Sequence, residues 1–248
     1  MRFARLLFVP PLFGCLIVLS AGCQTDIPPG EEKDVPPPAA ATKEPAGDGA
    51  TSETVELFDG KTLDGWSGEE GLWSVEEIDG FPTIVGTSAG LDHNSFLTTD
   101  RSFGDFELSF EIKLTPNSEN SGIQFRSERF VKDLAEGEEP GLDSEMRGYQ
   151  ADAAEGWWGK LYEESARGLL YPAKDNPDHE TAADAVKPNN WNRYRIRAEG
   201  DRIQTWINDQ PSVDLVDPKG RKEGLIGLQL HSGGPMTVRF RKFVMKTL

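Results

Sequence analysis

The segment FELSFEIKL, residues 106–114, alternates apolar and polar side chains without a break. Because successive side chains along a strand point to opposite faces, this alternation buries one face of a sheet and leaves the other in water. Antiparallel sheets allow such a half-buried strand, whereas parallel sheets are covered on both faces. The segment therefore predicts a strand of an antiparallel sheet that packs on a core through one face.

Further strands are predicted along the rest of the chain. The turn-rich TPNSENSG leads into GIQFR, which predicts a hairpin, and an EGD turn joins NRYRIRA to RIQTWIND in a second one. The final segments GLIGLQLH and MTVRFRKFVMK place Val238 and Phe240 on the core side. Helical periodicity is nowhere sustained and no internal repeat is visible, so the pattern predicts an all-β sandwich or barrel.

The first residues are typical of a secretory signal. Arg2 and Arg5 precede an apolar run, 6–19, which is too short for a membrane span and is interrupted by two prolines. The small residues 20–22 followed by Cys23 resemble the lipobox of bacterial lipoproteins, in which the cysteine becomes the lipidated first residue. We therefore expect residues 1–23 to be a lipoprotein signal peptide and Cys23 to carry lipid.

Residues 24–53 are rich in Pro, Ala, Gly and Glu and lack apolar periodicity. This composition predicts a disordered tether, followed by one β-sandwich domain over residues 54–248. Cys15 falls in the signal and Cys23 is capped by lipid, so no disulfide is expected.

The formal net charge of −16 argues against binding to nucleic acid or to anionic lipid headgroups. Membrane attachment is therefore expected through the lipid only, and the partner is expected to be a small neutral or cationic molecule. The expected location is the bacterial cell envelope, periplasmic or at the outer membrane.

Three predicted strands each carry two polar side chains spaced two residues apart. The pairs are Gln124 and Arg126 in GIQFR, Gln150 and Asp152 in GYQAD, and Gln229 and His231 in GLQLH. The period of two places both members of a pair on one face and turns Ile123 and Leu228 toward the core. Amides, a carboxylate, a guanidinium and an imidazole suit a polyol such as a sugar, although an ordinary solvated face is the simpler alternative.

Several motifs follow one another along the chain: ELFDGKTLDGW, NSGIQFR, GYQAD, GWWGKLYEESARG, WNRYRIRAEG, GLIGLQLH and VRFRKFVMK. Together they resemble the 3-keto-disaccharide hydrolase domain family over essentially all of residues 55–248. The resemblance implies a concanavalin A-like jelly roll of two antiparallel sheets with carbohydrate on a concave face. It also implies cleavage of glycosides that carry a ketone at carbon 3.

Such cleavage needs a base for the hydrogen on carbon 2, an electrophile for the enolate and an acid for the leaving oxygen. His231 is the expected base by residue type, with an edge cap of the core as its alternative. Asp152 is expected to be a base or a metal ligand, and Arg126 to stabilise the enolate. A buried structural ion pair is the alternative for both.

The resemblance also implies that the segment LYEESARG lies over the site. Tyr162, Glu163, Glu164 and Arg167 are then substrate-binding candidates, and the sequence leaves the choice between the two glutamates open. Glu164 and Arg167 have a simple surface pair as their alternative.

The adjacent Trp157 and Trp158 follow a glycine, which favours a stacking platform for a pyranose ring. Burial of both rings in the core is the alternative.

The sequence does not identify a cofactor. Zinc held by several histidines is disfavoured, because the mature chain keeps only His93, His179 and His231. An oxygen-rich site for calcium or manganese, with Asp152 or Glu145 as ligands, is the alternative that the sequence leaves open.

Two other functions are alternatives to cleavage of keto-glycosides. A two-carboxylate glycosidase needs a strand motif that the chain offers only as Glu77 and Asp79, which run into a turn. A non-catalytic carbohydrate-binding module needs amides and aromatic rings but no titrating base, and it stays the main alternative.

Overall fold

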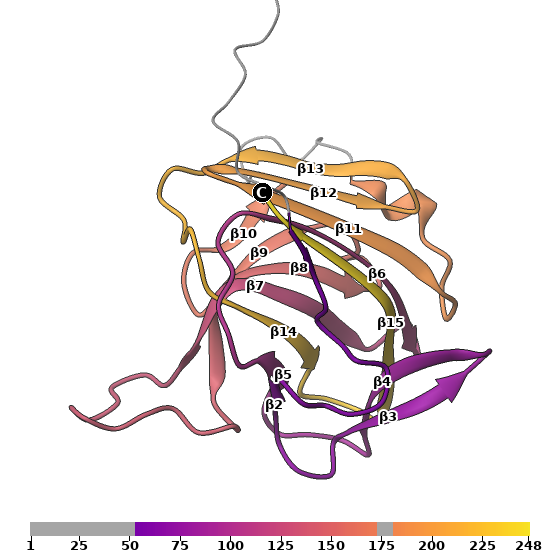
Figure 1. Cartoon of the computed structure of the whole chain (residues 1–248), viewed down its shortest axis with the longest axis horizontal. Helices are drawn as coiled ribbons and strands as arrows, with labels where there is room; N and C mark the ends of the chain where they lie inside the picture. Colours follow the sequence, from indigo (N-terminus) through magenta and orange to yellow (C-terminus); the bar gives the residue numbers. More distant parts are fainter. Residues whose placement is uncertain (1–52, 173–180) are drawn as a thin grey trace, which may run out of the picture. The chain divides into compact units, whose positions relative to one another are not determined.

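The computed structural model describes residues 53–172 and 181–248, and Figure 1 shows their arrangement. The predicted signal peptide 1–23, the lipidation site Cys23 and the tether up to residue 52 lie outside the described residues, as does His179. In the described part of the chain, no helix is long and apolar enough to cross a membrane.

Two antiparallel sheets form the domain. The larger sheet contains, in spatial order, β13 (Gln210–Val216), β12 (Arg202–Ile207), β11 (Asn192–Glu199), β6 (Phe106–Thr115), β15 (Met236–Thr247), β4 (Phe81–Ser88) and β3 (Trp73–Ile78), and β1 (Thr54–Val55) pairs with β15. The C-terminal strand β15 lies in the middle of this sheet, between β6 and β4. The end of the chain is therefore part of the core structure.

The smaller sheet carries the polar pairs. Its order is β10 (Gly168–Tyr171), β9 (Leu161–Glu164), β8 (Glu145–Ala154), β7 (Asn120–Phe130), β14 (Leu225–Leu230), β5 (Ser95–Thr99) and β2 (Trp66–Ser67). Among the described residues, the only helical element is a short 3₁₀ turn, η1 (Ala182–Ala185). The all-β prediction is confirmed.

The core lies between the two sheets. The alternate residues of β6, from Phe106 to Leu114, are at most 1% exposed, as the sequence pattern predicts. The Phe106 ring packs edge-on against Phe125 of β7 at 6.2 Å, which joins the two sheets. Val238 and Phe240 are fully buried, so the predicted inner side of β15 is confirmed.

One predicted hairpin is wrong. The strands β6 and β7 do not pair, because β6 lies between β11 and β15 while β7 lies between β8 and β14 in the other sheet. The turn between them crosses from one sheet to the other, which a local turn signal cannot distinguish from a hairpin. The second predicted hairpin, β11 with β12, is present with Glu199 opposite Arg202.

The turn expected around Asp79 is also present. Asp79 and Gly80 both have positive φ, 55° and 76°, and they join β3 to β4 with Ile78 opposite Phe81. A two-residue turn with both φ values positive matches the twist of a tight hairpin. The short acidic motif at Glu77 and Asp79 therefore belongs to a surface turn.

Candidate active site

The face of the smaller sheet that points away from the core carries a grid of polar side chains, which we call the polar face. One row crosses four neighbouring strands and contains Gly227, Gln124, Gln150 and Tyr162. In the next row, Gly122 of β7 lies opposite Asp152 of β8, and continuing the register of Leu228 opposite Ile123 places Gln229 of β14 on the other side of Gly122. Ile123 and Leu228 point the other way and belong to the core. The predicted face is present, with glycines interleaved among the larger polar side chains.

A chain of hydrogen bonds runs along the polar face. Ser127 Oγ donates to Gln124 Oε1 at 2.8 Å, and Gln124 Nε2 donates to Gln150 Oε1 at 2.8 Å. Gln150 Nε2 in turn donates to Asp152 Oδ1 at 2.7 Å. All four residues are at most 3% exposed. The chain therefore holds one oxygen of Asp152 in a fixed position.

A cavity of about 190 Å³ opens over this face. It is lined by Asn120, Gln150, Asp152, Trp157, Tyr162, Glu164 and His231. Pockets for drug-sized ligands span roughly 300–1,000 Å³, so this one suits a ligand of about one six-membered ring.

Asp152 is the most perturbed acid of the cavity. It is 3% exposed, and its second oxygen, Oδ2, has no hydrogen-bond partner. Burial raises the pKa of Asp152 from 3.8 to about 7, the charge of Glu164 acts in the same direction, and the Gln150 bond and Lys160 oppose the shift. The carboxyl group can therefore give up or take a proton near neutral pH.

Glu164 and His231 are two further titratable groups that line the cavity. Burial raises the pKa of Glu164, and the neighbouring Glu145 raises it further, while His231 lowers it. The Nδ1 atom of His231 lies 2.6 Å from the Ser232 carbonyl oxygen. A carbonyl only accepts, so Nδ1 carries the hydrogen and the neutral ring keeps its lone pair on Nε2.

Other polar atoms of the same face are buried without partners. Gln229 is fully buried, yet neither its Nε2 nor its Oε1 has a hydrogen-bond partner among the described residues, and Asn120 Oδ1 likewise has none there. Unpaired buried polar groups cost free energy and are rare in folded proteins. Their presence beside Asp152 indicates that this face binds a polar ligand or ordered water.

Arg126 does not belong to the cavity, and its predicted place beside Gln124 is wrong. The register between β7 and β8 shifts after Phe125, and Arg126 has a φ of 48°. Such a bulge inserts a residue and changes the phase of the side-chain alternation. Arg126 is 1% exposed and pairs with Asp105 at 2.6 Å. This is the structural ion pair that the sequence offered as the alternative to enolate stabilisation.

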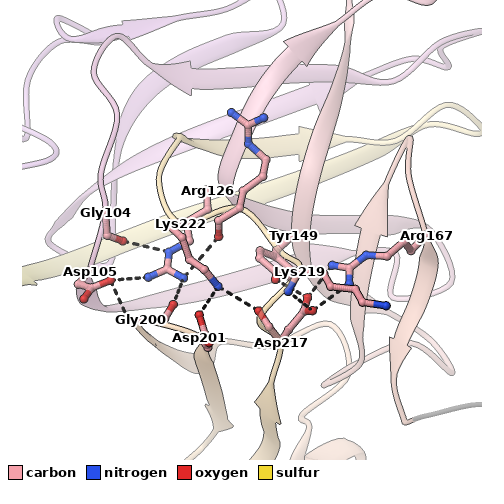
Figure 2. A network of polar contacts seen from close by, with 11 residues as sticks. Gly104, Asp105, Arg126, Tyr149, Arg167, Gly200, Asp201, Asp217, Lys219 and Lys222 are labelled. Atoms are coloured by element: carbon pink, nitrogen blue, oxygen red, sulfur yellow. Dashed lines mark hydrogen bonds and ion pairs between the residues drawn. The ribbon is translucent and has the colours of Figure 1, made fainter.

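Arg126 is part of a second polar cluster, shown in Figure 2, which we call the anchor network. Its side chain also donates to the carbonyl oxygens of Gly104 at 3.1 Å and Gly200 at 2.9 Å. Lys222 pairs with Asp201 at 2.6 Å and donates to the Asp217 carbonyl at 3.0 Å. These contacts join β7 to the β11–β12 turn and to the segment that precedes β14.

Arg167 and Glu163 also lie in the anchor network, not in the cavity. Arg167 pairs with Glu163 and binds Asp217 through two nitrogens, at 2.9 and 2.6 Å. Tyr149 donates to Asp217 at 2.5 Å, and Arg167 is the main cause that lowers the pKa of Asp217 to about 2. Because Glu163 and Glu164 are neighbours in β9, they point to opposite faces, and only Glu164 reaches the cavity.

The side chains of the two adjacent tryptophans lie in different environments. Trp157 is 38% exposed, lines the cavity and meets Tyr162 edge-on at 6.2 Å. Trp158 is 4% exposed and donates from Nε1 to Asn117 Oδ1 at 2.9 Å. Trp157 is therefore available for stacking, whereas the expectation for Trp158 is wrong because its ring is packed in the core.

The described residues do not fit a metal site of several acidic or histidine ligands. In residues 53–172 and 181–248, no group of three or more His, Cys, Asp and Glu side chains is placed to hold an ion. Asp152 and Glu145 lie seven residues apart on β8, about 20 Å along an extended strand. Glu145 instead accepts from Asn94 Nδ2 at 3.1 Å.

Two residues of the polar face escape a search for polar pairs in the sequence. Asn120 lies two residues before Gly122 and shares its face, so extending the period of two backward would have included it. Ser127 reaches Gln124 only because the bulge at Arg126 alters the alternation. No sequence signal marks that bulge, since Arg126 is not a glycine.

A two-layer antiparallel sandwich with a polar cavity on the outer face of one sheet is the architecture of the concanavalin A-like jelly-roll class. Residues 53–246 match the 3-keto-alpha-glucoside-1,2-lyase-like domain, and the chain belongs to that family. This places the protein among the carbohydrate-active domains.

One solved structure supports the fold. The crystal structure of a candidate glycosyl hydrolase from Parabacteroides distasonis is 17% identical, with 79% of this chain and 94% of that chain covered at a TM-score of 0.50. The carbohydrate-binding module CBM66 from Bacillus subtilis is 21% identical, with 74% and 96% covered at a TM-score of 0.49. No curated protein matches the chain. At these identities, the Parabacteroides likeness shows the fold and nothing further.

Proposed function

We propose that the protein cleaves 3-keto-glycosides in the cavity of the polar face, by elimination followed by addition of water. One observation carries this proposal: a buried carboxyl group that titrates near neutral pH shares the cavity with an imidazole whose Nε2 is free. A module that only binds sugar gains nothing from such a pair. General acid–base chemistry depends on it.

The reaction proceeds in two balanced steps. In the elimination, the hydrogen on carbon 2 leaves as a proton, its electron pair forms a double bond to carbon 1, and the glycosidic oxygen departs with the electrons of its bond to carbon 1. The leaving oxygen takes a proton from an acid. In the second step, water adds its oxygen to carbon 1 while carbon 2 regains a proton, so the net change is hydrolysis.

His231 and Asp152 have complementary parts in this scheme. His231 Nε2 takes the proton from carbon 2, and Asp152 gives the proton on Oδ2 to the leaving oxygen. During hydration, the ionised Asp152 takes a proton from water, and the protonated imidazole, once its Nε2 proton has exchanged with solvent, gives one to carbon 2. Both groups end in their starting state, as a general acid and a general base do in a complete catalytic cycle.

The developing enolate needs neutral donors, because Arg126 lies in the anchor network. Asn120 and Tyr162 line the cavity and carry an amide and a hydroxyl group that can donate to an oxyanion. Glu164, the second acid with a raised pKa, is proposed to bind a sugar hydroxyl. Trp157 offers its exposed ring to the apolar face of the sugar.

The proposal is tested by incubating the protein with a panel of 3-oxidised glycosides beside their unoxidised parents, with and without a chelator. The conjugated intermediate is followed by its ultraviolet absorbance, and the released sugar is quantified by chromatography. We expect turnover of the oxidised compounds only, and its collapse in His231→Ala with nearly intact sugar affinity. His93→Ala is the matched control, since His93 pairs with Asp92 and Glu69 outside the cavity.

Three outcomes would contradict the proposal. Turnover of the parents alone points to an ordinary glycosidase, and unchanged turnover in His231→Ala removes the imidazole from the mechanism. Binding without turnover of any compound favours the carbohydrate-binding module, which is the second candidate. Loss of activity in the presence of the chelator would instead indicate that the reaction needs a divalent cation such as calcium or manganese.

We also propose that the protein is anchored in the bacterial envelope through lipid on Cys23. The small residues before this cysteine support the proposal. Exchange of Cys23 for Ala should move the protein from the membrane fraction to the soluble fraction. An unchanged distribution would contradict lipid anchoring.

A further inference from the structure

The hydrogen-bond chain on the polar face has a direction. Each of its two amides has one end that donates and one that accepts, so the orientation of one amide sets the orientation of the next. The chain begins at the Ser127 hydroxyl, passes Gln124 and Gln150, and ends on Asp152 Oδ1. Both amide donors point toward Asp152, while the Ser127 hydroxyl also lies within hydrogen-bond distance of the Phe125 carbonyl oxygen, at 3.0 Å.

This direction decides which oxygen of Asp152 carries its proton. Oδ1 accepts the hydrogen of Gln150 Nε2. The lone pair of Oδ1 that points toward Gln150 therefore cannot also carry a proton. Oδ2 has no partner among the described residues and is free to take it. Asp152 is one of the residues that line the cavity, whereas its Oδ2 atom is itself buried.

We infer that Gln124 and Gln150 are positioning residues that keep the dissociable proton of Asp152 on Oδ2. The use of that proton as an acid rests on the proposed function, whereas its location rests on the geometry alone. Gln150 contacts Asp152 directly, and Gln124 acts only through Gln150 by fixing the orientation of its amide.

The backbone leaves room for this arrangement. A Cβ atom at Gly122, the residue opposite Asp152, would lie 2.9 Å from Gln150 Cγ and 2.9 Å from the Ala151 carbonyl oxygen. Gln150 thus reaches toward Asp152 across space that only glycine leaves open. A side chain at position 122 would displace the amide from the carboxylate.

Other charged or titratable groups also surround Asp152. Glu164 of β9 acts on it through its charge, Lys160 from the turn before β9 opposes that effect, and His231 of β14 lines the same cavity. From the larger sheet, Tyr194 Oη donates to the Asp152 backbone carbonyl at 3.3 Å. Among the described residues, no hydrogen bond joins any of these groups to Gln124, so changing Gln124 tests the amide chain separately.

The test is a double-mutant cycle read by titration of Asp152, without substrate. The carboxyl carbon of Asp152 is followed by carbon-13 NMR, and its signal is assigned by its loss in Asp152→Asn. Gln150→Met removes the donor to the carboxylate without adding charge and should raise the titration midpoint by about one pH unit. Gln124→Met should raise it by about 0.3 to 0.5 unit, because Gln150 loses the donor that orients it.

The double variant gives the decisive comparison. Because Gln124 acts through Gln150, its effect should vanish when Gln150 is already Met, so the double variant should titrate like Gln150→Met alone. Additive shifts, or no shift in Gln124→Met, would overturn the inference. Gln210→Met, at an exposed position of β13, is the control and should leave the midpoint unchanged.

Folding and function are separated in the same experiment. If Gln124→Met does not fold, Ser127→Ala removes the next donor along the chain, and its effect should likewise vanish in the Gln150→Met background. If the cycle behaves as expected and no keto-glycoside is consumed, the proton placement stands and the proposed function fails. If the cycle fails, turnover by the unaltered protein still tests the proposed function separately.

Discussion

Two buried polar clusters of the domain differ in how completely they are paired. In the anchor network, the side chains of Arg126, Tyr149, Arg167 and Asp217 all have partners, and the exception in the cluster is Nε of Arg221, which is buried without a partner among the described residues. On the polar face, Asp152 Oδ2 and both amide atoms of Gln229 have no partner in the described part of the chain. A fully paired cluster stabilises and fixes a structure, whereas unpaired buried groups are typical of sites that bind ligands.

The two aspartates of these clusters show what the difference does. Pairing with Arg167 lowers the pKa of Asp217 to about 2, and burial raises the pKa of Asp152 to about 7. The same residue type is thus a permanent anion in the anchor network and a proton donor or acceptor on the polar face. Two acids whose environments shift their pKa values in opposite directions have different tasks.

The largest expected effect concerns Asp152. Its raised pKa means that the unfolded chain ionises first as the pH rises, so the domain loses stability between about pH 4 and pH 7. A shift of about three units corresponds to about 4 kcal/mol above pH 7. Asp152→Asn cannot ionise and should therefore be more stable than the unaltered protein by about that amount at pH 8.

Chemical denaturation between pH 4 and pH 8.5 measures this difference. The gain in the free energy of unfolding should shrink toward zero at the acid end, where the aspartate is protonated in both states. Turnover should fall by about 10²- to 10⁴-fold in the same variant, as expected for a lost general acid. Equal stability at pH 8 would show that Asp152 is not the perturbed acid described above.

The next effect concerns Arg126 in the anchor network. Arg126→Met leaves the carbonyl oxygens of Gly104 and Gly200 without their donor and should lower the free energy of unfolding by about 3 kcal/mol. Affinity for sugar should not change, because the residue lies outside the cavity. Arg202→Met, which removes an exposed pair with Asp214, is the control and should have little effect. If a folded Arg126→Met variant lost affinity for sugar, Arg126 would have to belong to the binding site.

Asp217 should behave in the opposite way to Asp152. Its lowered pKa contributes stability that is present above pH 4 and is lost as the pH falls toward 2. Asp217→Asn should therefore be less stable than the unaltered protein by about 2 kcal/mol at pH 7, and the difference should narrow in acid. Denaturation curves at pH 7 and pH 3 test this. A variant as stable as the parent at pH 7 would mean that the Arg167 pair contributes nothing.

The smallest effect distinguishes the neighbouring glutamates. Glu164→Gln keeps the size of a side chain that lines the cavity and should lower kcat/KM by about tenfold, the equivalent of one lost hydrogen bond to a substrate. Glu163→Gln weakens the pair with Arg167 and should lower the thermal midpoint without changing kcat/KM. Steady-state kinetics and thermal unfolding of both variants make the comparison. Equal kinetic losses would contradict their assignment to opposite faces.

The sequence predicts most of the polar face because the period of two is a property of the strand itself. That rule alone places Gln150 and Asp152 on one face and turns Ile123 away from Gln124, whereas the pairing of β7 with β8 brings Gln124 beside Gln150. It fails at Arg126, where one inserted residue reverses the alternation. A bulge depends on how β7 pairs with β8, which a single segment does not encode.

Other failures have the same origin in long-range structure. The turn before GIQFR leads to the opposite sheet and not to a hairpin, because the core residues of β6 and β7 face each other across the sandwich. Trp157 and Trp158 look equivalent in sequence, and only the partner of Trp158 at Asn117 fixes one ring inside. The choice of Glu164 over Glu163 likewise follows from the position of Asp217, far along the chain.

The most direct test of the chemistry is to run the reaction on a 3-keto-glycoside in deuterated water and analyse the released sugar at early times. Elimination and hydration through His231 and Asp152 predict one deuterium on carbon 2 of the product, where the removed proton is replaced from solvent. The released sugar, incubated alone for the same time, controls for exchange beside the ketone. A product that keeps its original hydrogen on carbon 2 would contradict the account.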